Sequence, residues 1–237
     1  YGSDIVDLLR AADEFSNQNE DFQINNQIFL AGYSEGGYAT MAAHQIIERD
    51  HSEEFSITAS FPMAGAYDMS GIMTDVMLDY TPYGEPFYFP YVLFAYCDSY
   101  QNMLAPVEDY LLPEYASVLL NLFDGTHSGD EINNSMPNIP ITIMKPDTIQ
   151  SFQNNSDHPL RLALQENDLY DWTPQASMHI MHGLADELIP FENAQLAYDT
   201  FTNNGAPDVN LIPIPESFGG HQDAAPFALL GAFELSE

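Results

Sequence analysis

Residues 26–37 have the sequence NQIFLAGYSEGG, and this stretch decides the predicted fold. Its first half, Asn26–Ala31, is a short apolar run that stops abruptly at a glycine, which is typical of a strand buried in a parallel sheet. Its second half, GYSEGG, carries the G-x-S-x-G pattern around Ser34. Because Glu35–Arg49 is predicted to be a helix rich in small residues, the pattern lies between a strand and a helix, the context that supports it.

The glycines of this pattern have a steric explanation. A sharp strand-to-helix turn strains the backbone of Ser34, and we expect side chains at positions 32 and 36 to crowd it. The Ser34 hydroxyl would then stand above a helix N-terminus, which favours developing negative charge. Ser34 is therefore the candidate nucleophile, and the backbone N–H of Glu35 is one candidate oxyanion donor. Taken alone, the pattern could equally be an ordinary tight turn that contains a serine.

Strands and helices alternate on both sides of this turn, which predicts an α/β class with a parallel sheet and helices on its faces. Strands are expected near 27–31, 57–63, 178–182 and 209–214. Helices are expected at Ser3–Asn17, Glu35–Arg49, Pro190–Asn203 and Ala224–Leu235.

Between the second and third predicted strands the amino-acid composition changes. The chain becomes dense in aromatic residues, Leu, Met and Pro, and we interpret residues 67–172 as a helical cap inserted between two parts of a core, 1–66 and 173–237. Short helices are expected at Met69–Asp79, Pro90–Tyr100, Pro106–Leu122 and Pro159–Leu169, with a less obvious strand at Ile139–Met144. Most of the aromatic residues would form the core of the cap, and a few would contact substrate; the candidates are Tyr33, Phe87, Phe89 and Phe94.

Two further segments supply the partners of a serine. Asp186 follows a predicted strand, at the sheet edge where open α/β sheets place functional groups. His221 ends the segment FGGH, which we expect to be a flexible loop after the last strand. The imidazole could take the proton of Ser34 while the carboxylate fixes its tautomer. Glu187 is an alternative to Asp186, although we expect it to face solvent, and His182 is expected to make a structural hydrogen bond.

These segments together resemble the α/β-hydrolase superfamily: GYSEGG as its nucleophile elbow, HGLADELIP as its acid loop and GGH as its histidine loop. Residues 170–206 resemble more narrowly the secretory type of lipase, which carries a helical cap. The resemblance implies an α/β-hydrolase fold and a serine esterase or lipase without cofactor. Carried over by position, Ser34 is the nucleophile, Asp186 the acid and His221 the base.

The sequence departs from the superfamily in one respect. The usual sheet has about eight strands, with the nucleophile after the fifth, whereas here the nucleophile follows the first predicted strand. The four predicted strands map onto the second half of that sheet, and the loop that normally supplies a second oxyanion N–H is absent. A bare edge on an apolar strand is a pairing hazard. We therefore expect a C-terminal portion of a longer fold, completed by an N-terminal fragment or a second chain.

The charge balance excludes several partners. The chain has 36 Asp and Glu against 4 Lys and Arg, a net charge of −32. Such a surface repels phosphate, so we expect no nucleic-acid partner and no attraction to anionic membranes. No segment approaches the roughly 20 apolar residues of a membrane span. No metal site is expected, since no His, Asp and Glu grouping has ligand spacing, and Cys97 is the single cysteine.

Three functions remain open at this stage. The first is a carboxylic-ester hydrolase acting on a small-molecule ester. The second is an aminopeptidase-like enzyme of the same fold, in which cap carboxylates hold a substrate amine; the candidates are Asp98, Glu108, Asp109 and Glu114. The third is a non-catalytic binding protein that retains the fold.

Overall fold

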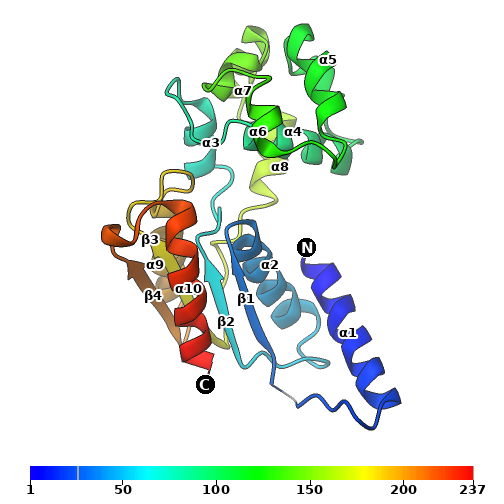
Figure 1. Ribbon diagram of the computed structural model, residues 1–237, viewed down its shortest axis with the longest axis vertical. Coiled ribbons are helices and arrows are strands. Elements are labelled where there is room, and N and C mark those ends of the chain that lie inside the picture. Colours follow the sequence, from blue (N-terminus) through cyan, green and yellow to red (C-terminus); the bar gives the residue numbers. More distant parts are fainter. Residues whose placement is uncertain (26, 237) are drawn as a thin grey trace. The chain divides into compact units, whose positions relative to one another are not determined.

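The computed structural model describes residues 1–25 and 27–236, so Asn26, the first residue of the predicted strand 26–31, lies outside the described residues (Figure 1). The chain forms two compact units. The first unit runs from Tyr1 to Asp68 and resumes at Leu169, and the second comprises Met69–Asp168. The sequence had suggested boundaries at 67 and 172.

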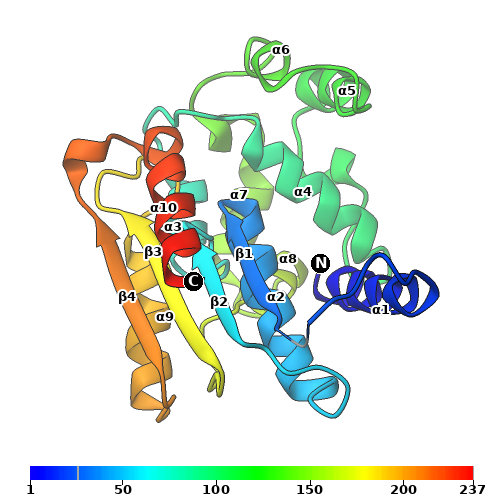
Figure 2. The same cartoon turned by 60° about the horizontal axis from the view of Figure 1, so that its bottom comes forward.

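The first unit is built on a four-stranded parallel sheet in the order β1-β2-β3-β4 (Figure 2). The strands are β1 (Phe29–Tyr33), β2 (Ala59–Met63), β3 (Ser177–Gly183) and β4 (Val209–Ile214). Because all four strands run in parallel, their carboxyl ends meet at one edge of the sheet. The predicted alternation of strands and helices is therefore confirmed in this unit.

The first strand, β1, lies at the end of the sheet. It pairs with β2 in a register that sets Phe29 opposite Ala59 and Tyr33 opposite Met63. Within the described residues no further strand pairs with β1. The sequence of β1 is apolar enough for the centre of a sheet, yet its first side chain, Phe29, is 39% exposed. Completion of the sheet by an N-terminal fragment or a second chain stays a prediction.

Helices cover both faces of the sheet. On one face lie α2 (Glu35–Asp50) and α9 (Glu192–Asn203), and α1 (Gly2–Gln18) packs against α2. On the other face lies α10 (His221–Ser236), which packs on Phe61 and Met63 of β2. The face of each strand residue follows from its place in the strand, because successive side chains point to opposite sides.

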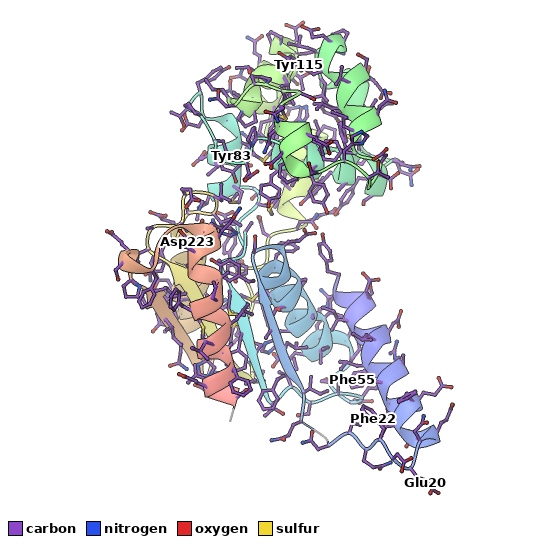
Figure 3. The ribbon with its side chains drawn as sticks, viewed as in Figure 1. Glu20, Phe22, Phe55, Tyr83, Tyr115 and Asp223 are labelled. Atoms are coloured by element: carbon purple, nitrogen blue, oxygen red, sulfur yellow. The ribbon has the colours of Figure 1, made fainter. Side chains whose placement is uncertain are left out.

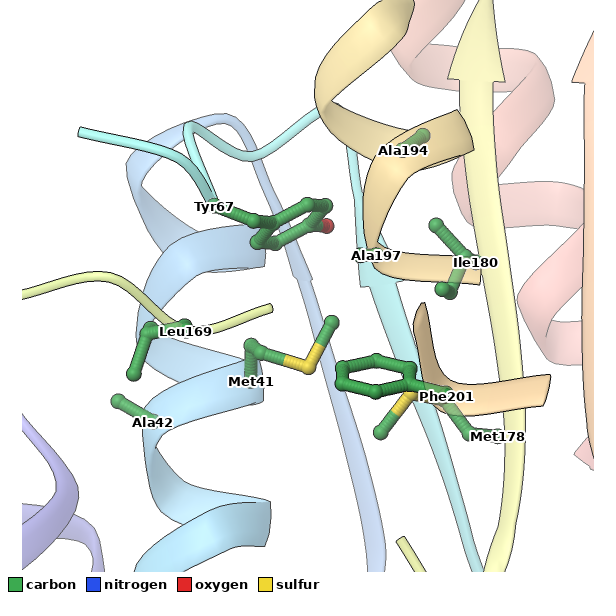
Figure 4. Close-up of a cluster of buried hydrophobic side chains, with 9 residues drawn as sticks. All are labelled: Met41, Ala42, Tyr67, Leu169, Met178, Ile180, Ala194, Ala197 and Phe201. Carbon is green, nitrogen blue, oxygen red and sulfur yellow. The ribbon is translucent and has the colours of Figure 1, made fainter. Parts of the chain in front are cut away.

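Figure 4 shows the core between α2, α9 and the sheet. Met41 of α2 and Phe201 of α9 meet Met178 and Ile180 of β3 there, and all four are buried. Tyr67 is also part of this cluster, and its backbone carbonyl accepts a hydrogen bond from the N–H of Leu169 at 2.8 Å. This contact joins the two stretches of the first unit at the point where the chain leaves it and returns.

The second unit is helical. Its helices are α3 (Ile72–Leu78), α4 (Tyr88–Ser99), α5 (Pro113–Leu122), α6 (Gly129–Asn133), α7 (Pro146–Asn154) and α8 (Pro159–Gln165), with short 3₁₀ turns η1 (Val107–Asp109) and η2 (Pro140–Ile143). The sequence pointed to α3, α4, α5 and α8 but missed α6 and α7. Ser128 and Glu131 cap α6 reciprocally, a capping box that the sequence does contain.

The strand predicted at Ile139–Met144 is wrong. Pro140–Ile143 is the 3₁₀ turn η2, with the N–H of Thr142 bonded to the Ile139 carbonyl at 3.1 Å. Pro140 fixes a φ that suits the first position of a helical turn and gives no N–H to a ladder. The apolar run instead buries Ile141 and Ile143 among helices, with only an isolated bridge from Met144 to Leu111.

Candidate functional site

Ser34 occupies the turn between β1 and α2. Its backbone has φ 60° and ψ −121°, a positive φ that is rare outside glycine. The turn is held because the N–H of Ser34 donates to the carbonyl of Met63 at 2.9 Å, and the N–H of Tyr38 donates to the Ser34 carbonyl at 3.1 Å. The strained conformation projects a half-buried hydroxyl at the start of α2, and Glu35 is the first residue of that helix.

The glycines around this turn differ from expectation in one position. A Cβ at Gly32 would overlap the backbone of Gly36, and a Cβ at Gly37 would overlap the backbone of Met63. A Cβ at Gly36 would meet nothing within 4 Å. The crowding expected at position 36 is therefore wrong. The second critical position is 37, because α2 lies directly against the backbone of β2 at that residue.

Asp186 lies in the loop after β3, and both oxygens of its carboxylate have hydrogen-bond partners. Its side chain is fully buried. Oδ1 accepts hydrogen bonds from the N–H groups of Leu188 at 3.0 Å and Ile189 at 2.8 Å. Burial by itself would raise the pKa of Asp186, but hydrogen bonds from His182, His221 and the Ile189 N–H outweigh it and hold the pKa well below its ordinary value. The group is therefore a carboxylate at neutral pH.

His221 joins the other two side chains. Its Nδ1 lies 2.6 Å from Oδ2 of Asp186, and its Nε2 lies 2.8 Å from Oγ of Ser34. A carboxylate can only accept, so Nδ1 carries the proton and Nε2 is left to accept the serine hydroxyl. Three residues from distant parts of the chain thus form one continuous path for a proton, and all three belong to the first unit.

The loop predicted at 218–221 is shorter than expected, because His221 is the first residue of α10. The helix begins there with the N–H of Ala224 bonded to the carbonyl of Gly220 at 3.0 Å. Asp223 lies in this first turn (Figure 3). A histidine fixed at a helix start has less backbone freedom than one in a flexible loop, which favours a constant position of the imidazole.

Two side chains that sequence reasoning did not place there hold the backbone of His221. The hydroxyl of Tyr33 donates to its carbonyl oxygen at 2.5 Å, and the Tyr33 ring lies against the imidazole with centroids 5.2 Å apart. Oε2 of Glu187 accepts from its N–H at 2.9 Å. Glu187 is exposed as a residue, as expected, but this carboxylate oxygen is engaged. In the sequence, the one sign that Tyr33 would contact this site is that it directly precedes Ser34.

The remaining aromatic candidates lie in the second unit. The ring of Phe87 contacts that of Tyr88 in a tilted arrangement, and the ring of Phe94 meets that of Phe123 edge-on. Phe89 is buried and lines a small apolar pocket within that unit together with Phe152. Substrate contact by Tyr33, Phe87, Phe89 and Phe94 stays a prediction.

A second serine, histidine and carboxylate lie together in the first unit. Nδ1 of His44 lies 2.7 Å from Oγ of Ser60, and its Nε2 lies 2.9 Å from Oε1 of Glu48. His44 and Ser60 are both fully buried. The Glu48 carboxylate also accepts from the N–H groups of Gln175 and Ala176. This group joins α2 to β2 and to the segment before β3, and no substrate could reach it.

Neither a metal cluster nor a membrane helix is found in the part of the chain that the structure describes. There, no three His, Cys, Asp or Glu side chains converge as ligands of one ion. In the same residues, no helix combines the length and the apolar character that crossing a bilayer requires.

Comparisons with known proteins place this geometry in context. No family model and no curated protein matches the sequence. Among solved structures, the rice cell wall degrading esterase LipA from Xanthomonas oryzae matches with a TM-score of 0.80 and 25% identity, over 95% of this chain and 60% of its own. A protein from Legionella pneumophila described as a hydrolase matches with a TM-score of 0.84 and 25% identity, over 97% and 60%.

Lipase A from Candida antarctica matches with a TM-score of 0.74 and 20% identity, over 96% of this chain and 51% of its own, a likeness in fold alone. The chain spans about 60% of the length of the first two proteins. The four-stranded parallel sheet and the helices on its faces match part of these longer structures. The chain therefore has the α/β-hydrolase fold over part of its usual extent, and it is similar in structure to esterases and lipases built on that fold.

Proposed function

We propose that this chain is a serine hydrolase that cleaves carboxylic esters through an acyl-enzyme on Ser34. The observation that carries the proposal is the hydrogen-bonded path from Ser34 through His221 to Asp186, with distances of 2.8 and 2.6 Å. The likeness to esterases and lipases supports the same class of reaction. Because the chain spans only part of those proteins, the activity is proposed for the whole protein that carries it.

Each residue has a distinct role in this reaction. Oγ of Ser34 attacks the ester carbonyl while Nε2 of His221 takes its proton. Asp186 keeps the imidazole in the tautomer that can accept this proton and stabilises the imidazolium that forms. The protonated His221 then gives the proton to the departing alcohol. A water molecule then gives a proton to the same nitrogen and attacks the acyl-enzyme. As the bond to Oγ breaks and the carboxylic acid leaves, His221 returns this proton to Oγ of Ser34.

The negative oxygen of the tetrahedral intermediate needs donors in place before it forms. The start of α2 beneath Ser34 supplies a helix N-terminus, and the N–H of Glu35 is the proposed donor there. Removing one such donor typically costs about 10²–10³ in rate. A second donor from outside this chain would therefore affect the rate strongly.

The test is covalent labelling of the full-length protein with a fluorophosphonate, followed by peptide mapping, together with hydrolysis of nitrophenyl esters. We expect one label on Ser34, and loss of both label and activity in Ser34→Ala. Ser60 is the matched internal control, because it also contacts a histidine but is fully buried. It should carry no label in the folded protein.

The alternatives predict different results. Faster cleavage of amino-acid anilides than of esters would replace the esterase by an aminopeptidase-like enzyme. A folded protein whose Ser34 takes no label would indicate a binding protein that retains the fold. Either result would overturn the proposal.

A further inference from the structure

We propose that His182 is a positioning residue for Asp186, a second imidazole in contact with the carboxylate that holds His221. The inference rests on the proposed function, since it concerns the same proton path. Its starting point is that Oδ2 of Asp186 lies between two imidazoles. Nδ1 of His221 is 2.6 Å away and Nε2 of His182 is 3.2 Å away.

The protonation of His182 follows from its partners. Its Nε2 lies 2.8 Å from the backbone carbonyl of Ile189, which can only accept, so Nε2 must carry a hydrogen. Its Nδ1 is buried without a hydrogen-bond partner among the described residues. A proton on Nδ1 would leave a buried charge with an unsatisfied donor, which is much more costly than an unused lone pair. His182 is therefore a neutral imidazole with its hydrogen on Nε2.

The surroundings of His182 hold its ring, and therefore the hydrogen on Nε2, in one orientation. The ring is fully buried at the end of β3 and packs edge-on against Phe191, with centroids 5.9 Å apart. The carbonyl that orients it belongs to Ile189, whose N–H donates to Oδ1 of Asp186. Ile189 thus holds the carboxylate directly, through its N–H, and indirectly, through the carbonyl that orients His182. A rotation of the Asp186 side chain would break its contacts with both Ile189 and His182.

The consequence concerns the strength of the contact between Asp186 and His221. The single Nε2 hydrogen of His182 is shared between the Ile189 carbonyl at 2.8 Å and Oδ2 of Asp186 at 3.2 Å. Its positive charge offsets part of the negative charge on Oδ2 and moderates the attraction of this oxygen for an imidazolium. Without it, the Asp186–His221 pair would hold a proton more tightly and release it at higher pH. Among the described residues, Ser34, Tyr33 and Glu187 are the other side chains hydrogen-bonded to His221, and none of them is hydrogen-bonded to His182.

The experiment compares His182→Phe, which keeps an aromatic ring but has no donor, with His182→Gln, whose amide nitrogen can replace Nε2. In His182→Phe we expect the acidic limb of the kcat/KM profile for a nitrophenyl ester to move up by roughly 0.5–1 pH unit. We expect kcat/KM at the optimum to fall roughly two- to tenfold. His182→Gln should restore most of both.

The matched control is His179→Phe. His179 lies on the same strand, stacks on Phe61 with centroids 5.3 Å apart and bonds to Ser177, but it does not contact Asp186. Its profile should keep the wild-type midpoint. An acidic limb that stays in place in both His182 variants, or that moves equally in His182→Phe and His182→Gln, would overturn the inference.

A second readout needs no turnover and so separates this inference from the proposed function. Carbon-13 NMR of the Asp186 carboxyl group reports its titration directly. We expect the pKa of Asp186 to rise in His182→Phe, because a hydrogen bond that lowers it has been removed. If the wild-type protein hydrolyses no ester, the proposed function fails, but this shift still decides the role of His182. An unchanged Asp186 titration would contradict that role.

Discussion

The hydroxyl of Tyr33 donates a hydrogen bond to the backbone carbonyl of His221 at 2.5 Å, across 188 positions of sequence. Tyr33 ends β1 and His221 begins α10, so one contact joins the strand before the serine to the helix that carries the imidazole. Burial raises the pKa of Tyr33, and the charges of Asp186 and Glu187 raise it further. The hydroxyl therefore remains a donor throughout the neutral range.

Replacing Tyr33 with phenylalanine keeps the ring beside His221 and removes only this donor. We expect kcat for ester hydrolysis to fall roughly two- to tenfold with KM nearly unchanged, the cost of one hydrogen bond that orients the base. Steady-state kinetics measures both constants. Tyr198→Phe on α9 is the control for loss of a hydroxyl elsewhere. An unchanged kcat in Tyr33→Phe would show that the position of His221 does not depend on the Tyr33 hydroxyl.

Alanine at Gly37 and alanine at Gly36 should have opposite effects. At position 37 the methyl group meets the backbone of Met63, and an overpacked position typically costs about 1–3 kcal/mol. At position 36 there is open space, and alanine in a helix gains about 0.5–1 kcal/mol over glycine. Urea unfolding of both variants measures the difference. Equal stabilities would contradict the close crossing of α2 over β2.

The buried group of His44, Ser60 and Glu48 predicts a pH-dependent loss of stability. Burial raises the pKa of Glu48, but the His44 hydrogen bond and the N–H groups of Ala176 and Gln175 lower it below its ordinary value. A carboxylate with a lowered pKa stabilises the fold above its unfolded pKa, and this stability is lost as the pH falls through the folded value.

Glu48→Gln should therefore be less stable than wild type at pH 7, by about 1–3 kcal/mol, and the difference should shrink in acid below about pH 4. Urea unfolding at several pH values measures it. Glu53→Gln, at an exposed position in the turn after α2, should show little change at any pH. A Glu48→Gln deficit that stays constant from pH 7 into acid would exclude this role of the charge.

The net charge of −32 predicts that salt stabilises the protein. At 1 M salt the Debye length falls to about 3 Å, which screens most repulsion between surface carboxylates. Screening also weakens the exposed ion pair of Arg10 and Glu54, whose charged atoms lie 2.7 Å apart, but such a pair contributes little stability to lose. We expect the Tm to rise by about 2–4 °C for each kcal/mol of repulsion relieved. A Tm that falls with sodium chloride would contradict this expectation.

The parts of the fold that local patterns determine could be predicted from the sequence. The apolar run before Ser34, the small residues of α2 and the strand before Asp186 each have a period or a boundary that neighbouring residues fix. Since parallel strands share one carboxyl edge, these predictions already bring the serine, the aspartate and the histidine toward the same place. Their hydrogen-bond distances required the structure.

Other features depend on contacts that no local pattern records. Whether Gly36 or Gly37 is crowded depends on where α2 crosses β2, and the Tyr33 hydroxyl meets a carbonyl far away in sequence. In the second unit, the run Ile139–Met144 has the composition of a strand, but within the described residues its only β pairing is the isolated bridge from Met144 to Leu111. Pro140 and the surrounding helices determine its shape instead.

The hydrogen bond from Leu169 to Tyr67 closes a hundred-residue excursion with its two ends side by side. The entropy cost of closing a loop grows only slowly with its length. Inserted segments of very different size could therefore connect Tyr67 to Leu169 at nearly the same cost in stability of the first unit. The helices beyond it can then differ in number and length without disturbing the sheet or the hydrogen bonds among Ser34, His221 and Asp186, all of which lie in the first unit.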